Sequence, residues 1–202
     1  MLSTILSRPM HRMRTDCSGL AAAEFATVAP VFLVLMMGSL DAGHTLYTRS
    51  VLAGAVEAAA RSSALETGNT ATADAMVSDM VSPIAPGMQL TTSRLSYFDF
   101  SDIGRPERWT DSNGNDTCDA GEVYIDENRS GGWDEDLGSI GNGGANDVVV
   151  YEVRITYEPV FAVPFLPVSW LERSASATAV RKNQPFALQR AYSTTTGTCT
   201  DV

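Results

Sequence analysis

Hydrophobic residues are distributed unevenly along this chain, and their spacing predicts its elements. Residues 20–40 form an apolar run that holds a single charge, Glu24. A helix of this length is sufficient to cross the roughly 30 Å hydrocarbon core of a bilayer. Apolar and small residues then recur with helical spacing, so we expect one helix over 20–67. Pro30 lies inside this helix and predicts a local kink or a melted turn.

The rest of the chain predicts one short helix over residues 72–82. Three strands are expected to follow it, over residues 88–100, 147–157 and 171–182. The strand over 147–157 is the clearest, because apolar and polar residues alternate along it. Prolines mark an irregular crossing before the last strand, at Pro159, Pro164 and Pro167. The tail from Ala187 is expected to be loose unless Cys199 anchors it. These elements predict an α+β fold in which a long N-terminal helix, half transmembrane and half soluble, packs on a small antiparallel sheet.

Charge is concentrated in one segment of the 202-residue chain, whose net charge is −10. Residues 99–147 contain nine Asp and four Glu against three Arg, and acids balance bases elsewhere. An acidic chain without a basic patch is a poor nucleic-acid binder. Both histidines, His11 and His44, lie outside the predicted soluble domain's core. That domain therefore lacks the histidine base of Ser-His or Cys-His enzymes, and we expect no enzymatic activity.

A short motif precedes and opens the apolar run. Gly19 lies five positions before Glu24, after three basic residues, Arg8, Arg12 and Arg14. Positive residues stay on the cytoplasmic side, so we expect a cytoplasmic N-terminus and export of the chain beyond about residue 41. A carboxylate inside a membrane span costs about 2.5–3.5 kcal/mol on insertion scales, so Glu24 is expected to have a partner. A conventional secretory signal peptide is the rival interpretation of the same pattern.

This N-terminal pattern resembles type IV pilin-like proteins and, more closely, the TadE-like minor pilins of the Tad (tight adherence) pilus. The likeness rests on Gly19, Glu24 and Phe25, and on a second patch over 147–186. It implies that a prepilin peptidase cleaves between Gly19 and Leu20, which leaves Glu24 fifth in the mature chain. It also implies that Glu24 pairs with the new amine of Leu20 in a neighbouring subunit.

The resemblance implies a bacterial inner-membrane protein with a single pass and a periplasmic C-terminal domain, which either primes the extracellular pilus or is incorporated into it. The expected segments are a leader over 1–19, a transmembrane helix over 20–40 and a helix extension over 41–67. An α+β domain follows over 68–202 and contains an acidic insert over 101–147. The expected partners are other pilins and minor pilins through the N-terminal helix, the prepilin peptidase and the inner-membrane assembly platform. The expected role is assembly or initiation of the pilus. A minor pseudopilin of a secretion system and an uncleaved, membrane-tethered, calcium-dependent binding module are the alternatives.

Two cysteines follow the leader, which itself contains Cys17. Cys118 and Cys199 form an even pair, as expected for a disulfide in an oxidising compartment. A bridge between them would stabilise the fold by roughly 4–5 kcal/mol in the chain-entropy model. Two unpaired thiols are the alternative.

The acidic segment contains the spacing of a calcium loop over residues 111–122. Oxygen-bearing residues occupy its positions 1, 3, 5, 7, 9 and 12, namely Asp111, Asn113, Asn115, Thr117, Asp119 and Glu122. Calcium takes six to eight oxygen ligands, and a bidentate carboxylate at position 12 closes the shell. Asp116 stands at position 6, where glycine is usual, and Asp tolerates the left-handed backbone that this position requires.

A second copy follows, with Gly131 at the glycine position. Its candidate ligands are Asp126, Asn128, Ser130, Gly132, Asp134 and Asp136. Leu137 takes the place of the closing glutamate, so Asp136 is expected to substitute for it. One or two calcium ions would neutralise a segment that otherwise repels itself. A solvated acidic loop built from ordinary turn-forming residues is the alternative.

Overall fold

The computed structural model of the chain describes residues 19–65, 68–161 and 172–200. They form two compact units, one containing residues 19–44 and 159–161 and the other containing residues 45–65, 68–158 and 172–200. Several features predicted from the sequence lie outside the described residues: the leader up to residue 18, Pro164, Pro167 and the start of the last strand at Leu171.

The long N-terminal helix, α2 (Leu20–Ser63), continues through Pro30 without interruption. Proline has no N–H to donate, so this position lacks one helical hydrogen bond while the flanking turns hold the helix. The helix ends at Ser63 and not at residue 67 as predicted. The hydroxyls of Ser62 and Ser63 turn back to carbonyl oxygens one turn earlier, at 2.9 and 3.1 Å, and such local bonds compete with helix continuation.

Four antiparallel strands form the main sheet, in the order β3-β1-β4-β5. Their bounds are β1 (Gln89–Tyr97), β3 (Ser139–Ile140), β4 (Val148–Tyr157) and β5 (Arg173–Lys182). The apolar residues of β4 that were predicted to share a face are buried, including Tyr151, Val153 and Ile155. The strand predicted over 88–100 is shorter, because Asp99 caps a 3-10 turn, η1 (Phe100–Asp102), and accepts the N–H of Phe100 at 2.8 Å.

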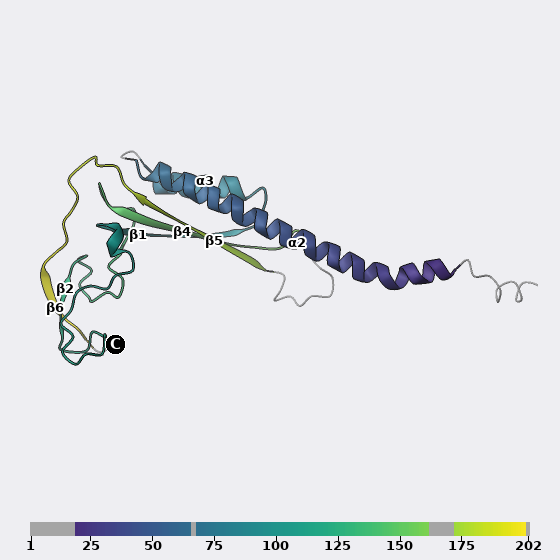
Figure 1. The fold of residues 1–202 in the computed structure, drawn as a ribbon. Helices are drawn as coiled ribbons and strands as arrows, with labels where there is room; N and C mark the ends of the chain where they lie inside the picture. Colours follow the sequence, from purple (N-terminus) through teal and green to yellow (C-terminus); the bar gives the residue numbers. More distant parts are fainter. Residues whose placement is uncertain (1–18, 66–67, 162–171, 201–202) are drawn as a thin grey trace, which may run out of the picture. The chain divides into compact units, whose positions relative to one another are not determined.

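The second half of α2 and the helix α3 (Thr70–Val81) cover the same face of this sheet (Figure 1). Asn69 caps α3, since its Oδ1 accepts the N–H groups of Ala71 and Thr72 at 2.8 and 3.2 Å. The buried core joins the two helices to β4 and β5 through Leu52, Ala55, Val56, Ala59, Val77, Val81, Tyr151, Val153, Ile155, Ala175 and Ala179. The α+β fold predicted from the sequence is confirmed.

A second, two-stranded sheet was not predicted. It pairs β2 (Val123–Asp126) antiparallel with β6 (Thr195–Thr198). Gly197 faces Tyr124 across this pair, and a Cβ at Gly197 would collide with the tyrosine ring. The C-terminal tail is therefore ordered through residue 200, and Cys199, which the sequence offered as its anchor, is disulfide-bonded to Cys118.

A partly buried charge cluster fastens α3 to the sheet. Asp74 of α3 accepts two hydrogen bonds from the guanidinium of Arg94 in β1, at 2.5 and 3.1 Å, and one from Tyr151 Oη in β4, at 2.6 Å. The Arg94 guanidinium also lies 4.0 Å from the centroid of the Tyr151 ring. Burial opposes ionisation of Asp74, but the hydrogen bonds from Arg94 and Tyr151 prevail and lower the pKa of this carboxyl group.

We expect Asp74→Asn to lower the free energy of unfolding by about 2–3 kcal/mol, because it leaves the nearly buried Arg94 without its counter-ion. Asp79→Asn on the exposed face of the same helix is the matched control and should change stability by less than about 0.5 kcal/mol. Urea unfolding at pH 7 measures both. Since the pKa of Asp74 is lowered in the fold, the difference from wild type should persist above about pH 4 and shrink as the pH falls below it. Equal losses for the two variants would contradict a role for the cluster.

Candidate functional site

The start of α2 presents the predicted processing and assembly residues on an exposed surface. Gly19, Leu20, Glu24 and Phe25 are all exposed, with Leu20 at 63% and Phe25 at 73%. A Cβ at Gly19 would meet no other atom within 4 Å, so packing in the described structure does not require glycine there.

The apolar surface of α2 continues along the following turns. Large apolar residues exposed by 41–65% are Val28, Val31, Phe32, Leu33, Val34, Leu35 and Met36. An 18-residue window of this helix has a mean hydropathy of 2.0, and by length and composition the helix can span a membrane. Glu24 is the one acidic or basic residue in this exposed run.

The acidic segment folds into two loops that we call loop A (residues 111–122) and loop B (residues 126–137). Loop A precedes β2, and the last residue of β2, Asp126, is the first residue of loop B. No α-helix lies between residues 98 and 147, all of which the structure describes. The two loops are therefore not parts of helix–loop–helix units, as expected from the sequence.

Loops A and B repeat the same hydrogen bonds at a spacing of 15 residues. In loop A the carboxylate of Asp111, at position 1, accepts the N–H of Asp116, at position 6, at 3.0 Å. In loop B the carboxylate of Asp126 accepts the N–H of Gly131 in the same way, at 3.2 Å. Both position-6 residues have positive φ, 58° for Asp116 and 88° for Gly131, so the aspartate adopts the conformation that the glycine position requires.

Three further contacts also match between the two loops. The side-chain oxygen at position 3 accepts the N–H of position 5 at 3.1 Å in loop A and 2.8 Å in loop B. The side-chain oxygen at position 5 accepts the N–H of position 7, at 3.0 Å in loop A and at 3.3 Å in loop B. The side-chain amide at position 3 donates to the carboxylate at position 9, at 2.6 Å in loop A and at 2.9 Å in loop B. The residues that make these contacts are Asn113, Asn115, Thr117 and Asp119 in loop A, and Asn128, Ser130, Gly132 and Asp134 in loop B.

Glu122 holds loop A closed from position 12. Its Oε1 accepts the N–H of Ser112 at 2.7 Å, and its Oε2 accepts the N–H of Asp119 at 3.2 Å. Loop B has no such residue at position 12, where Leu137 is buried. Asp136, the substitute suggested by the sequence, accepts instead from Tyr97 Oη at 2.9 Å and from the N–H of Gly138 at 3.0 Å.

Glu107 is a buried carboxylate beside loop B that the sequence analysis did not single out. Its side chain is 0% exposed, and it accepts the N–H groups of Glu127, Asn128 and Asp134 at 2.7, 3.2 and 3.3 Å. Burial raises the pKa of Glu107, and these N–H groups oppose the rise only in part. The missing glutamate at position 12 was the one sequence signal that a carboxylate from elsewhere serves this loop.

Arginine residues hold the neighbouring Glu127 in its ionised form. The guanidinium groups of Arg105 and Arg108 each lie 2.9 Å from its carboxylate oxygens. Although burial opposes ionisation, these arginines lower the pKa of Glu127 to about 2. By contrast, backbone N–H groups, that of Asp116 first, lower the pKa of Asp111 at the exposed start of loop A.

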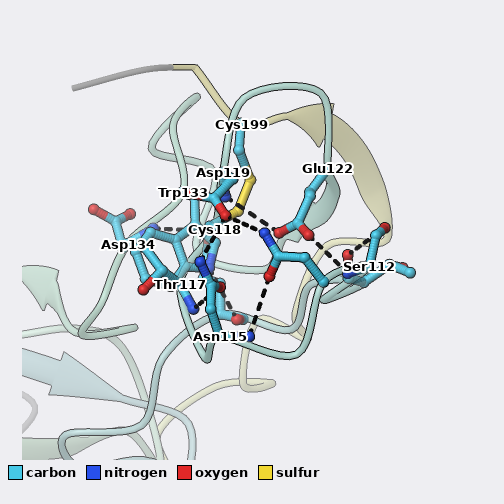
Figure 2. The surroundings of a disulfide bond; sticks show 12 residues. Ser112, Asn115, Thr117, Cys118, Asp119, Glu122, Trp133, Asp134 and Cys199 are labelled. Atoms are coloured by element: carbon cyan, nitrogen blue, oxygen red, sulfur yellow. Dashed lines mark hydrogen bonds between the residues drawn. A yellow bond between two sulfur atoms is a disulfide. The ribbon is translucent and has the colours of Figure 1, made fainter.

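The disulfide between Cys118 and Cys199 lies where the two loops meet. Figure 2 shows Asp119 and Glu122 of loop A close to the bridge, with Trp133 and Asp134 of loop B beside it. Cys118, Cys199 and Tyr124 form a small buried cluster against which Trp109 and Trp133 pack. The bridge spans a sequence separation of 81 residues, with its Cα atoms 5.8 Å apart. It therefore ties the C-terminal strand to loop A.

The donors of these loops fit a hard cation better than a soft one. They are carboxylate, amide, hydroxyl and carbonyl oxygens, which calcium prefers. The Oδ1 atom of Asp126 is shielded from solvent and has no hydrogen-bond partner among the described residues. Among those residues no three His, Cys, Asp or Glu side chains already converge on one point, so an ion would have to draw the carboxylates together.

One comparison with known proteins identifies the N-terminal region. Residues 19–61 match the family model of TadE-like proteins. No curated protein and no solved structure matches the chain. The matched range holds nearly all of α2, and so the exposed apolar surface with Gly19, Glu24 and Phe25 belongs to a TadE-like segment. TadE-like proteins are a structural, pilin-type family associated with Tad pili and not a family of enzymes.

Proposed function

We propose that this chain is a TadE-like minor pilin that contributes to the assembly or initiation of a Tad-type adhesive pilus. The observation that supports it most strongly is the position of Glu24 on an exposed apolar helix that matches the TadE-like family. Exposed Leu, Val, Phe and Met side chains need an apolar environment, which either lipid or the helices of other subunits can provide. The proposed partners are therefore other pilins and minor pilins, which contact this chain through α2.

Glu24 gives this helix a preference for other subunits over lipid. A carboxylate surrounded by lipid is costly, and a positive partner at hydrogen-bond distance removes much of that cost. The proposed partner is the amine of Leu20 in a neighbouring subunit, released when a prepilin peptidase cleaves after Gly19. Before assembly the helix would lie in the bacterial inner membrane, close to the assembly platform, with its N-terminus in the cytoplasm and the folded domain in the periplasm.

We also propose that loops A and B bind calcium, as a structural ligand of the same protein. The repeated hydrogen bonds orient oxygen atoms of both loops in the same way, and Asp126 Oδ1 has no partner among the described residues. An ion in each loop would offset the repulsion among carboxylates in the most acidic segment of the chain. Affinities of about 10⁻⁴–10⁻³ M, typical of extracellular modules, would suffice where calcium is abundant.

Two alternative functions predict different experimental observations. A minor pseudopilin of a secretion system would share the cleavage and differ in its neighbouring genes. An uncleaved, membrane-tethered, calcium-dependent binding module would keep residues 1–19 in the native protein.

The first test changes the charge on the helix. Glu24→Ala should leave the protein in the membrane fraction but reduce its amount in sheared pili by about tenfold or more, the effect of losing one ion pair of 1.4 kcal/mol or more. Thr27→Ala is the matched control, because its hydroxyl bonds only to the carbonyl oxygen of Glu24, one turn earlier. Immunoblots of sheared filaments and membranes measure both. Normal amounts of Glu24→Ala in the pili would contradict the assembly role.

The second test concerns cleavage. Mass analysis of the protein from its native host should find Leu20 as the first residue, while Gly19→Leu should retain the leader. Gly43→Leu is the control, since a Cβ at either glycine meets no other atom within 4 Å and only Gly19 adjoins the cleaved bond. A native protein that keeps residues upstream of Leu20 while pili form normally would favour the uncleaved binding module.

The third test concerns calcium. At a calcium concentration of about 100 times Kd, each site adds about 2.7 kcal/mol to the free energy of unfolding. The melting temperature of the full chain in detergent micelles should therefore rise by roughly 5 °C or more in 10 mM calcium relative to chelator. Magnesium at equal ionic strength is the control for charge screening, because it fits large oxygen-rich loops poorly. Superimposable melting curves in calcium and chelator would rule out this proposal.

A further inference from the structure

We propose that the two edges of the main sheet are complementary, so that β5 of one copy of the chain pairs in parallel with β1 of the next copy. This pairing continues the sheet from one subunit to another. It goes beyond the proposed function, which places the contacts between subunits in α2, and part of the argument for its direction rests on that function.

The outer edge of β5 is long and regular. β5 is the last strand in the order of the sheet, and none of the described strands pairs with its outer side. It keeps one register with β4 from Arg173 to Lys182, so no bulge interrupts it. Alternate residues of such a strand point their N–H and C=O groups away from β4. A hollow of about 360 Å³ adjoins its first half, lined by Arg49 of α2, Arg154 and residues 174–176. The edge is therefore open to another strand.

The sequence of β5 does not protect this edge along its centre. Sheets commonly block an exposed edge with proline, a bulge, a short strand or a charge. Residues 174–180 are all serine, alanine, threonine or valine, and the charges stand at the ends, at Arg173, Arg181 and Lys182. Two β5 strands paired antiparallel about Ala177 would place Arg173 opposite Arg181, and parallel pairing in register would place each base opposite its copy. Like charges directly opposite each other are destabilising, so the strand that β5 accepts is a different one.

The other edge of the sheet offers such a strand. β3 covers only Leu95 and Ser96 of β1, and the N–H of Gly141 donates to the carbonyl oxygen of Arg94 at 3.0 Å. The outer side of residues 89–93 pairs with none of the described strands. These five residues are Gln, Leu, Thr, Thr and Ser, so an uncharged edge meets the uncharged centre of β5.

Charge favours the parallel direction. The acidic segment over 99–147 begins shortly after Tyr97, the last residue of β1. Parallel pairing brings the basic end of β5 toward the acidic segment of the next copy, whereas antiparallel pairing brings it toward Gln89. Arg181 already forms an ion pair with Glu57 of its own copy, so exposed Lys182 is the base that gains most. Complementary charges of this kind select one orientation of an interface over another.

The topology of the sheet agrees with this direction. β1 and β5 run in the same direction, because both are antiparallel to β4. Parallel pairing therefore adds each copy without turning it over, as copies inserted into one membrane through α2 require. A contact between two different surfaces of the same chain is heterologous, and it can continue into a ring or an open filament.

Cysteine cross-linking in membranes of the native host tests this pairing. Thr91 of β1 and Ser176 of β5 are exposed and lie in one row across the sheet, on either side of Arg154. Within one copy they are two strand spacings apart, about 10 Å. A disulfide needs Cα atoms within about 7 Å, so a bond between these positions joins two copies.

The experiment co-expresses full chains with two different tags, one carrying Thr91→Cys and the other Ser176→Cys, both with Cys17→Ser. After oxidation with copper phenanthroline, we expect a product that carries both tags. Its yield should exceed by at least about fivefold that of the control, in which Thr72→Cys on the exposed face of α3 replaces Thr91→Cys. Because these residues are exposed, the substitutions should leave the fold intact, and the native Cys118–Cys199 bridge, checked by mass analysis, reports on it.

Two further comparisons test direction and charge. Ser174→Cys, Ser176→Cys and Thr178→Cys are compared as partners, first of Thr91→Cys and then of Ser93→Cys. In parallel pairing the preferred position on β5 moves toward its C-terminal end when the cysteine moves from residue 91 to 93, and in antiparallel pairing it moves the other way. Adding Lys182→Glu should lower the yield about threefold or more, because it places a like charge beside the acidic segment.

The outcomes separate this inference from the proposed function. If no β5 cysteine gives a doubly tagged product above the control while wild type is present in sheared pili, the edge pairing is overturned and the pilin assignment stands. A product of one tagged copy with another host protein, in place of the doubly tagged one, also overturns it, and so does a shift in the antiparallel direction. A doubly tagged product in membranes without wild type in pili supports the edge pairing and contradicts only the pilin assignment.

Discussion

Small side chains on the second half of α2, such as Ala55 and Ala59, let this helix lie directly against the buried face of β4. Alanine removes the bulk that would separate a helix from a sheet, and the tyrosine and branched residues of β4 fill the remaining space. β4 also pairs with both β1 and β5, so this packing fixes three strands at once. Because Tyr97 and Val148 are paired residues, the two ends of the acidic segment lie side by side in the sheet.

That segment is stabilised in a different way from the main sheet. Its apolar cluster is small, with Tyr124 and the two cysteines at its centre and two tryptophans around it. Backbone N–H groups and arginines satisfy its buried carboxylates, and the disulfide joins it to the last strand. Small folded units commonly need covalent or metal cross-links, because their cores alone supply little stability. Calcium bound in the loops would provide such a cross-link in a segment that has few apolar contacts.

Strong periodic patterns in the sequence predicted α2, α3, β1, β4 and β5 with bounds close to those observed. β2, β3 and β6 were missed because two to four residues give no measurable alternation, and because each depends on a partner far away in the chain. Loop spacing predicted the oxygen-bearing residues that share hydrogen bonds in both loops. Glu107 was not predictable in this way, since its neighbours in space, Glu127 and Asp134, are 20 or more residues away in sequence.

The pairing of β2 with β6 has a consequence for biogenesis. β6 ends at Thr198, while its partner strand is synthesised some 70 residues earlier. Contacts between distant residues form slowly, since loop closure must be paid for before they are made. The two-stranded sheet of the acidic region and the disulfide beside it therefore cannot form until β6 and Cys199 have been synthesised.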